Sequence, residues 1–346
     1  MPALNEPLVQ GKTELPCLWT TRAGDYVTGV SWSSDGALCA AGVASGEILL
    51  LDGADGTVKT TIAAHPGGVL AVTWSPSARL LATAGQDGTA KLHRDDGTLV
   101  ATLPGASKAW VEHLAWSPDG KRLATSSGKI VRIWTAEGAP HLETGEHAST
   151  VTGLAWNRRG SQLATTSYGG VHIWRFESGA SSRELPWKGS LISLAWSPDD
   201  KVIACGSQDC SVHFWRLSTG QDSEMQGYPF KPKVLAWDAD STLLATSGGP
   251  TATVWRFSGK GPEGSKPVLL EGHRALITAL AFAPKRGLLV SGAEDTGILL
   301  WEPRRRDKPL GYAFLDDMVS DVAWRPRHLQ ITGADASGRV SSWAVP

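Results

Sequence analysis

Residues 111–134, VEHLAWSPDGKRLATSSGKIVRIW, decide the fold of this chain. The segment reads as three short strands, because large apolar residues alternate with small or polar ones in each apolar run. Pro118, Asp119 and Gly120 separate the first two runs, and these three residue types together are typical of a tight turn. The segment therefore predicts an antiparallel, three-stranded meander.

This segment is one of eight copies of a single repeat. Each copy has an aromatic residue that ends its first strand, and these anchors follow one another at steps of 40 to 45 residues. The anchors are Trp32, Trp74, Trp116, Trp156, Trp196, Trp237, Phe282 and Trp324. A second anchor follows 18 or 19 residues later, at Leu51, His93, Trp134, Trp174, Trp215, Trp255, Trp301 and Trp343. Thirteen of the sixteen tryptophans occupy these two positions, so the repeat governs where tryptophan stands.

The first strand of each copy has one large and one small face. The residue two before the anchor is Val or Leu in every copy, and the residue just before the anchor is Ser, Thr or Ala. Small residues suit the innermost strands of a propeller, which crowd round a central axis. Between one copy and the next lie stretches that fit a fourth, outer strand, such as residues 58–62, 99–103 and 268–270. With four strands in each unit of 40 to 45 residues, the repeat predicts an all-β fold. We expect an eight-bladed β-propeller of four-stranded antiparallel blades.

The two ends of the chain are expected to close the ring. Residues 15–19, LPCLW, read as an outer strand that has no blade of its own, and the eighth copy reaches Pro346 without an outer strand. We expect the N-terminal strand to complete the last blade, because ring closure removes exposed sheet edges. Residues 15–346 are then one propeller domain, and residues 1–14 are a disordered or loosely attached tail.

The repeat resembles that of the WD-repeat (WD40) β-propeller family over roughly residues 15–345. The family's Gly-His pair stands intact at Gly272-His273. The Trp-Asp pair that gives the family its name is not kept, because most copies have Arg, Thr or Glu after the second-anchor tryptophan. In that family a His, a Ser or Thr, an Asp and a Trp of one blade form a hydrogen-bonded tetrad. The resemblance implies this tetrad for His273, Ser291, Asp295 and Trp301. Copy two has His93 in place of the indole, and copy four has Tyr168 in place of the acid.

The resemblance also implies a non-catalytic scaffold or adaptor that holds protein or peptide partners on the rim of the ring. The connections that enter the first strands and the second-to-third-strand turns form one rim, which we call the entrance rim. Aromatic, Met and charged residues at or just before this position are candidate partner contacts, unless each packs on a neighbouring loop. They are Tyr26, Trp110, Trp187, Tyr228, Phe230, Lys231 and Met318, with Asp316 and Asp317 as an acidic sector.

The alternative hypothesis is a propeller enzyme, or a module that binds a small ligand or metal in the central channel. At the position three before the anchor most copies carry small residues, but His113 and Asp321 stand out and can face the channel. These two residues lie three blades apart in the expected ring, which is far for direct coordination of one ion. No G-x-S-x-G, P-loop or H-E-x-x-H pattern is present, so we expect no catalytic residue, no metal and no cofactor.

Composition bounds the partners and the compartment. The net charge is −1 and the pI is about 6.8, so nucleic acid and membrane surfaces are not expected partners. The four cysteines form no CxxC pair, which indicates reduced thiols in a cytoplasmic protein. The first residues do not read as a signal peptide, and no apolar run has the length of a membrane span. We expect a monomeric ring in the cytoplasm.

Overall fold

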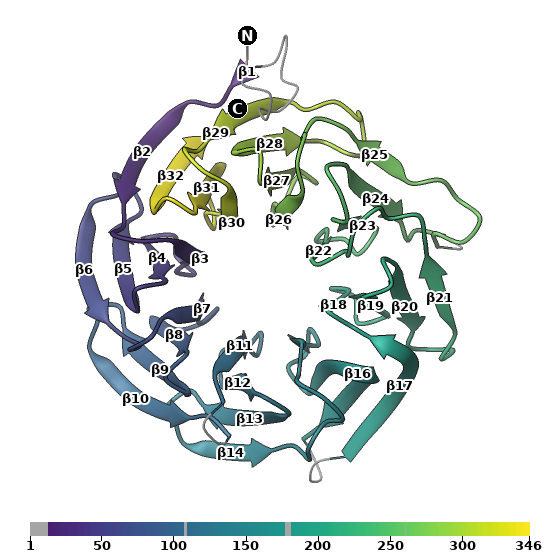
Figure 1. Ribbon diagram of the computed structural model, residues 1–346, viewed down its shortest axis with the longest axis horizontal. Coiled ribbons are helices and arrows are strands. Elements are labelled where there is room, and N and C mark those ends of the chain that lie inside the picture. The colour runs from purple at the N-terminus through teal and green to yellow at the C-terminus, as the bar shows by residue number, and fades with distance from the viewer. Residues whose placement is uncertain (1–12, 107–108, 177–180, 260) are drawn as a thin grey trace.

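The structure is a computed structural model that describes residues 13–106, 109–176, 181–259 and 261–346. These residues form eight β-sheets arranged as a ring around a central axis, as Figure 1 shows. Their regular secondary structure consists of strands. The prediction of an all-β, eight-bladed propeller is therefore confirmed.

Each blade begins with the strand nearest the axis, and all eight of these strands end on the anchor predicted from the repeat. The inner strands are β3 (Val27–Trp32), β7 (Val69–Trp74), β11 (Val111–Trp116), β15 (Gly153–Trp156), β18 (Ala195–Trp196), β22 (Leu235–Trp237), β26 (Ile277–Phe282) and β30 (Val319–Trp324). Each pairs antiparallel with the next strand of its blade; in blade three, for example, Trp116 lies opposite Leu123.

The middle of each blade is a β-hairpin. Its first strands are β4 (Leu38–Val43), β8 (Leu80–Gly85), β12 (Arg122–Ser127), β19 (Val202–Gly206), β23 (Leu243–Thr246), β27 (Leu289–Ala293) and β31 (Gln330–Asp335). Its second strands are β5 (Glu47–Asp52), β9 (Thr89–Arg94), β13 (Ile130–Thr135), β20 (Val212–Arg216), β24 (Ala252–Arg256), β28 (Gly297–Trp301) and β32 (Arg339–Ala344). In blade four β16 (Gln162–Arg175) supplies both arms, and Trp174 Nε1 donates across them to Thr165 Oγ1 at 3.0 Å.

The fourth strand of each blade lies on the circumference (Figure 1). These outer strands are β6 (Val58–Ala63), β10 (Leu99–Pro104), β14 (Pro140–Glu143), β17 (Ser181–Ser190), β21 (Asp222–Met225), β25 (Val268–Leu270), β29 (Gly311–Phe314) and β2 (Cys17–Arg22). Three come from stretches in which an outer strand is expected from the sequence, namely β6, β10 and β25.

The anchors hold neighbouring blades together. The buried cluster between blades one and two joins Ile48 and Leu50 to Val69 and Trp74. Four anchor indoles also donate to the inner strand of the preceding blade: Trp116 to Thr73 O at 3.3 Å, Trp156 to Ala115 O at 2.9 Å, Trp237 to Ala195 O at 3.4 Å, and Trp324 to Ala281 O at 2.9 Å. Each acceptor is the residue just before the previous anchor, so a small side chain there leaves room for the indole.

The N-terminal strand closes the ring. β2 pairs antiparallel with β32 and thereby becomes the outer strand of blade eight, which confirms the expected closure. The strand runs from Cys17 to Arg22 rather than over residues 15–19. Trp19 is buried at the seam of blades eight and one, 6.5 Å from the ring of Trp32 between centroids. It therefore joins two blades rather than only covering the outside of blade eight.

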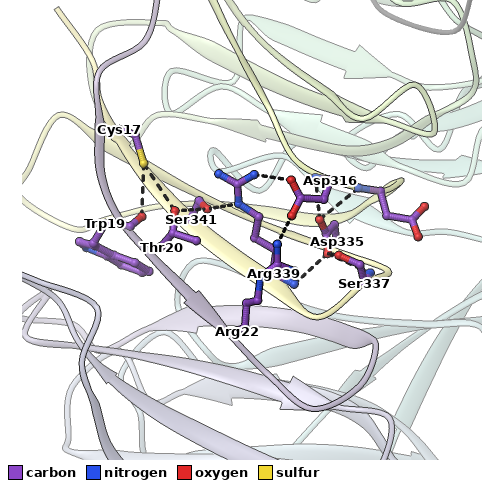
Figure 2. A network of polar contacts seen from close by, with 10 residues as sticks. Cys17, Trp19, Thr20, Arg22, Asp316, Asp335, Ser337, Arg339 and Ser341 are labelled. Carbon is purple, nitrogen blue, oxygen red and sulfur yellow. Dashed lines mark hydrogen bonds and ion pairs between the residues drawn. The ribbon is translucent and has the colours of Figure 1, made fainter. Parts of the chain in front are cut away.

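Polar contacts reinforce this closure, as Figure 2 shows. Arg22 of β2 and Arg339 of β32 both donate to the carboxylate of Asp316. The buried carboxylate of Asp335 accepts from the backbone N–H groups of Arg339 at 2.8 Å and Ser337 at 2.9 Å. Asp316 thus links the two strands of the closure, and Asp335 fixes the turn between β31 and β32. Both act through charge-assisted hydrogen bonds, which are stronger than neutral ones.

A short strand before β2 also joins the ring. β1 (Thr13–Glu14) pairs parallel with β29, with Thr13 opposite Gly311. Of the tail expected over residues 1–14, these two residues belong to the sheet of blade seven, and residues 1–12 lie outside the described residues.

Candidate functional site

Blade seven assembles the tetrad that the resemblance implies. Trp301 Nε1 donates to Ser291 Oγ at 2.8 Å, and Ser291 Oγ lies 2.7 Å from His273 Nε2. His273 Nδ1 lies 3.0 Å from Asp295 Oδ1. Because an ionised carboxylate can only accept, His273 donates from Nδ1, and Nε2 accepts from the serine hydroxyl. All four side chains are buried, so this chain of hydrogen bonds is a structural element of the blade.

Other blades build the same chain with different groups. In blade two His65 lies 3.0 Å from Asp87 Oδ1 and 2.8 Å from Thr83 Oγ1. In blade four the carbonyl oxygen of Lys129, 2.8 Å from His147 Nδ1, replaces the acid. Burial lowers the pKa of both His65 and His147, so both rings favour the neutral form. These histidines are therefore structural groups of the blades and not candidate functional residues.

Blade six puts a tyrosine where other blades have the histidine. Tyr228 is buried, and its hydroxyl lies 2.8 Å from Thr246 Oγ1, 18 residues further along the chain. The same separation of 18 residues joins His273 to Ser291 in blade seven. Trp255 Nε1 donates to the Tyr228 hydroxyl at 2.8 Å, and burial raises the pKa of Tyr228 to about 12. Tyr228 therefore anchors the connection into blade six and is not a side chain displayed on the rim.

This anchor displays the next aromatic residue. Phe230 N donates to Gly248 O at 3.0 Å, and the Phe230 side chain is 52% exposed. Gly248 has φ of +135°, and a Cβ there would lie 2.6 Å from the Tyr228 ring, so glycine is required. The tyrosine, the glycine and the backbone hydrogen bond fix the connection, and Phe230 is held out toward solvent on a rigid base.

Phe230 lines a pocket of about 420 Å³ on the entrance rim, which we call the entrance pocket. Its walls come from the connection into blade six, from the start of β26, and from the hairpin turns of blades five, six and seven. Apolar groups line much of it, including Phe230, Pro229 and Leu276, while Lys231 and Glu294 supply charge. A concave, mostly apolar site with a few charged groups suits an apolar side chain of a partner.

Comparison with known proteins places the chain in a family. Residues 26–262 match the family model described as the IFT122 first beta-propeller, and residues 264–302 match the WD domain, G-beta repeat. The first of these matches covers more than half of the 346 residues. The chain belongs to the WD-repeat β-propeller family. Members of this family are generally protein-interaction scaffolds and are typically not enzymes.

Individual relatives match only parts of this WD-repeat propeller. It is 40% identical over 76 residues to the periodic tryptophan protein 2 homolog of Neurospora crassa, a match that covers 22% of this chain and 8% of that protein. It is 27% identical over 90 residues to the 66 kDa stress protein of Physarum polycephalum, covering 26% and 15%. The segments matched are thus small fractions of these relatives.

A solved structure matches nearly the whole ring. The computationally designed Ika8 protein superposes with a TM-score of 0.81 over 95% of this chain and 100% of its own, at 21% identity. At this identity the likeness concerns the fold alone.

The exposed large apolar side chains of the described residues fall into two sets. Leu18, Val58, Leu99 and Leu269 lie on outer strands. Trp110, Tyr168, Phe230 and Met318 lie on the entrance rim, at 50%, 56%, 52% and 37% exposure. These four belong to blades three, four, six and eight, so they surround the rim rather than forming one patch.

Several predicted rim residues are occupied by contacts within the ring. Trp187 is partly buried and stacks on His213, with 3.8 Å between ring centroids, at the position where other blades carry the tetrad histidine. Lys231 Nζ donates to Gln208 Oε1 at 2.7 Å. Tyr26 is half-buried, and burial together with the charge of Asp321 raises its pKa. Among the predicted contacts, only Phe230 and Lys231 share the entrance pocket.

The predicted acidic sector serves the backbone and the ring closure. Burial opposes the charge of Asp316, but hydrogen bonds from Arg22 and Arg339 outweigh this and lower its pKa. Asp317 Oδ1 accepts from the N–H of Met318 at 2.7 Å. The charge of Asp316 is thus largely neutralised within the protein.

The two predicted channel residues are tied to the backbone of different blades. Asp321 accepts from Val30 N at 2.9 Å and from Val322 N at 2.8 Å, so it links blade eight to blade one. Burial raises the pKa of Asp321 to about 6 against the effect of these hydrogen bonds. Burial lowers the pKa of His113, and a backbone contact with Val151 partly offsets this. The structure does not bring the two side chains together in one site.

Across the described residues, no group of three or more His, Cys, Asp or Glu side chains is arranged to hold a metal ion. In the same part of the chain, no helix has the length and apolar character needed to cross a bilayer.

Reasoning from sequence missed several residues of the rim. Tyr168 is the most exposed of the four rim side chains. Because it stands at the tetrad's acid position, the sequence pattern indicates only that the acid is replaced and does not predict a rim residue. The entrance pocket is also lined by residues from blades five, six and seven, namely Cys210, Lys233, Leu276 and Glu294. A signal was available for Tyr228, since its separation of 18 residues from Thr246 equals that of the tetrad histidines from their hydroxyls.

Proposed function

We propose that this WD-repeat propeller is a non-catalytic scaffold that holds a protein or peptide partner at the entrance pocket. The observation that carries the proposal is Phe230, an exposed aromatic side chain on a rigid connection beside a pocket of about 420 Å³. Aromatic residues in well-formed pockets dominate the binding energy of protein interfaces, and a fixed base lowers the entropy lost on binding. Trp110, Tyr168 and Met318 offer further contacts to a partner that extends across the rim.

We further propose that the protein acts as a monomeric ring in the cytoplasm, with neither nucleic acid nor membrane as its partner. The four cysteines are free thiols, which supports a reducing compartment. The net charge of −1 supports the absence of broad electrostatic binding to nucleic acid. Light scattering coupled to gel filtration tests the monomer, and a dimer mass would contradict it.

The test of the rim site begins with a random peptide display library selected on the intact ring. Dissociation constants of the recovered peptides are then measured by calorimetry for the wild type and two variants. Phe230→Ala removes the displayed ring, and Leu269→Ala removes a side chain of similar exposure, 48% against 52%, from the outer strand of the same blade.

The pair of variants separates the rim from the circumference. We expect Phe230→Ala to weaken binding by 2 kcal/mol or more, about thirtyfold, because truncation of an interface hot spot costs about this much. Leu269→Ala should leave the affinity unchanged. Equal affinities of the two variants, or a selection that recovers no binding peptide, would contradict the proposed rim site.

A further inference from the structure

The rim opposite the entrance rim carries a pocket of a different kind. The first-to-second-strand turns of blades seven and eight border a cavity of about 560 Å³, which we call the basic pocket. Its lining includes Lys285, Arg286, Arg325, Arg327 and His328, and none of its described lining residues is Asp or Glu. Because the whole chain has a net charge of −1, this is a local concentration of positive charge.

The cations of this pocket differ in what they do. Arg325 is structural, since it donates to Gly36 O at 2.8 Å and Gly53 O at 2.7 Å. Lys285, Arg286 and Arg327 are exposed, and the ion pairs found among the described residues include none from these three. Three cations therefore face solvent, and no carboxylate within the part of the chain that the structure describes forms an ion pair with them.

A nearby arginine run shows the contrast. Arg304 donates to Asp238 at 2.6 Å and lies 3.0 Å from Asp240, and Arg305 pairs with Glu302 at 3.2 Å. The charges of Arg304 and Arg305 are balanced within the ring, so these two arginines offer little to an anionic partner. Arg304 and Arg305 therefore belong to a solvated turn, whereas the exposed cations of the basic pocket remain available to a ligand.

The backbone of the basic pocket favours residues other than arginine. Arg286 has φ of +76° and Arg327 has φ of +64°, in the left-handed region. The corresponding turns of blades one, three and four place Gly36, Gly120 and Gly160 in this conformation, and those of blades five and six place Asp200 and Ser241 there. A side chain with a Cβ is strained in this region, and Asn and Asp tolerate it better than most other residues do. The turns thus hold cations where their conformation favours glycine.

The floor of the pocket is apolar. Trp324 and Leu329 line it and are more buried than the three exposed cations, and the exposed Pro284 adds a further apolar group. The guanidinium groups of arginine match carboxylates through paired hydrogen bonds. A ligand that suits both features combines carboxylates with an apolar side chain, as an acidic peptide does. Nucleic acid fits less well, because it requires a basic surface that follows a long phosphate backbone.

We propose that the juxtaposition of three unpaired cations with the apolar floor forms a second binding site, which takes an acidic segment of a partner polypeptide. The site lies on the rim opposite the entrance pocket, so the ring can hold two partner segments at once. It is independent of the proposed entrance site, because the two share no lining residue.

Fluorescence anisotropy with the full chain tests this proposal. The probe is a fluorescein-labelled Glu-Glu-Leu-Glu-Glu peptide, and its Gln-Gln-Leu-Gln-Gln analogue reports the part of binding that is not due to charge. The double variant Arg286→Asn with Arg327→Asn removes two cations, and asparagine tolerates the left-handed backbone. Lys285→Gln is a milder variant outside that strained conformation, in case the double variant folds poorly.

The matched control is Arg158→Asn with Arg159→Asn. These exposed arginines occupy the equivalent turn of blade four, where Asp199 and Asp200 line the same cavity as Arg159. The control therefore makes the same change in net charge on the same rim. Unlabelled peptide, inorganic phosphate and a single-stranded oligonucleotide serve as competitors.

We expect saturable binding of the glutamate peptide to the wild type. The affinity should fall about tenfold or more for the glutamine analogue, and also for the glutamate peptide with the Arg286/Arg327 variant. Each charge-assisted hydrogen bond that is lost lowers the affinity by about that factor. Lys285→Gln should weaken it by a smaller factor, and the control should bind as the wild type does. Three results would overturn the proposal: no saturable binding, equal losses in the two double variants, or displacement by phosphate or oligonucleotide at lower concentration than by unlabelled peptide.

Discussion

At the scale of single residues, the ring uses one hydrogen-bonding scheme with interchangeable parts. A hydroxyl accepts from the second-anchor indole in blades four and seven, and a histidine completes the chain. In blade six Tyr228 replaces the histidine and itself accepts from the indole. In these three blades the scheme pairs the buried polar groups that it joins, and an unpaired buried group costs about 1–3 kcal/mol.

The first prediction tests this scheme in blade seven. Trp301→Phe removes the indole N–H that donates to Ser291, while Trp74→Phe removes an indole N–H for which the described residues supply no hydrogen-bond acceptor. Both tryptophans are buried, so the two changes lose similar packing. We expect Trp301→Phe to lower the free energy of unfolding by about 1–3 kcal/mol more than Trp74→Phe does. Urea denaturation measures the difference, and equal losses would show that the tetrad contributes no stability of its own.

The second prediction concerns Asp321, whose pKa is raised to about 6 in the folded ring. A carboxyl whose pKa rises on folding binds its proton more tightly in the folded state, so its contribution to stability falls as pH rises. We expect the margin in unfolding free energy between the wild type and Asp321→Ala to be largest below about pH 4 and to shrink up to about pH 6. Denaturation of both proteins across this range measures the margin, and a margin that grows with pH would contradict the prediction.

Residue roles were predictable from sequence where they recur in the repeat, as for His273 and Trp301. They were not predictable where a residue departs from it, because the departures depend on neighbours in other blades. Trp187 and Tyr228 look like rim residues by position, yet His213 and Thr246 hold them inside. The entrance pocket was not predicted either, because the residue pattern of the first strands does not determine how the loops of three blades pack together.

At the scale of strands, the ring depends on β2 and β32, which lie at opposite ends of the sequence. The sequence predicted this pairing because the eighth copy has no outer strand and residues 15–19 form a strand that has no blade of its own. The position of Trp19 between blades one and eight was not predictable, since the side on which an outer strand buries its residues depends on register. The pairing of Thr20 with Ser341 sets that register.

The third prediction removes this strand. Deletion of residues 1–22 should lower the free energy of unfolding by at least about 3–5 kcal/mol, because the loss of one buried tryptophan alone costs that much. It should also promote self-association through the freed edge of β32. Deletion of residues 1–14 is the control, because it takes away β1 and leaves β2. Thermal melts and gel filtration compare the two, and a deletion of residues 1–22 that behaves like the control would refute closure by β2.

At the scale of the whole molecule, the residues that stabilise the ring differ from those that we propose contact a partner. The anchors and the closure stabilise the blades, while the exposed side chains of the entrance rim contribute little to the core. The fourth prediction follows for Trp110, which is 50% exposed. Trp110→Ala should leave the melting temperature close to that of the wild type and weaken a partner that spans blades three and four. Differential scanning calorimetry and calorimetric titration check both parts, and a large fall in the melting temperature would place Trp110 in the core instead.

The central claim is that the entrance pocket is where a partner binds. Hydrogen–deuterium exchange of the full chain, with and without a peptide selected on the ring, tests it most directly. The account predicts slower exchange at residues 228–233, 247–249 and 276–278, which border the pocket, with little change on the outer strands. Protection confined to the outer strands or to the inner strands that face the channel would contradict it.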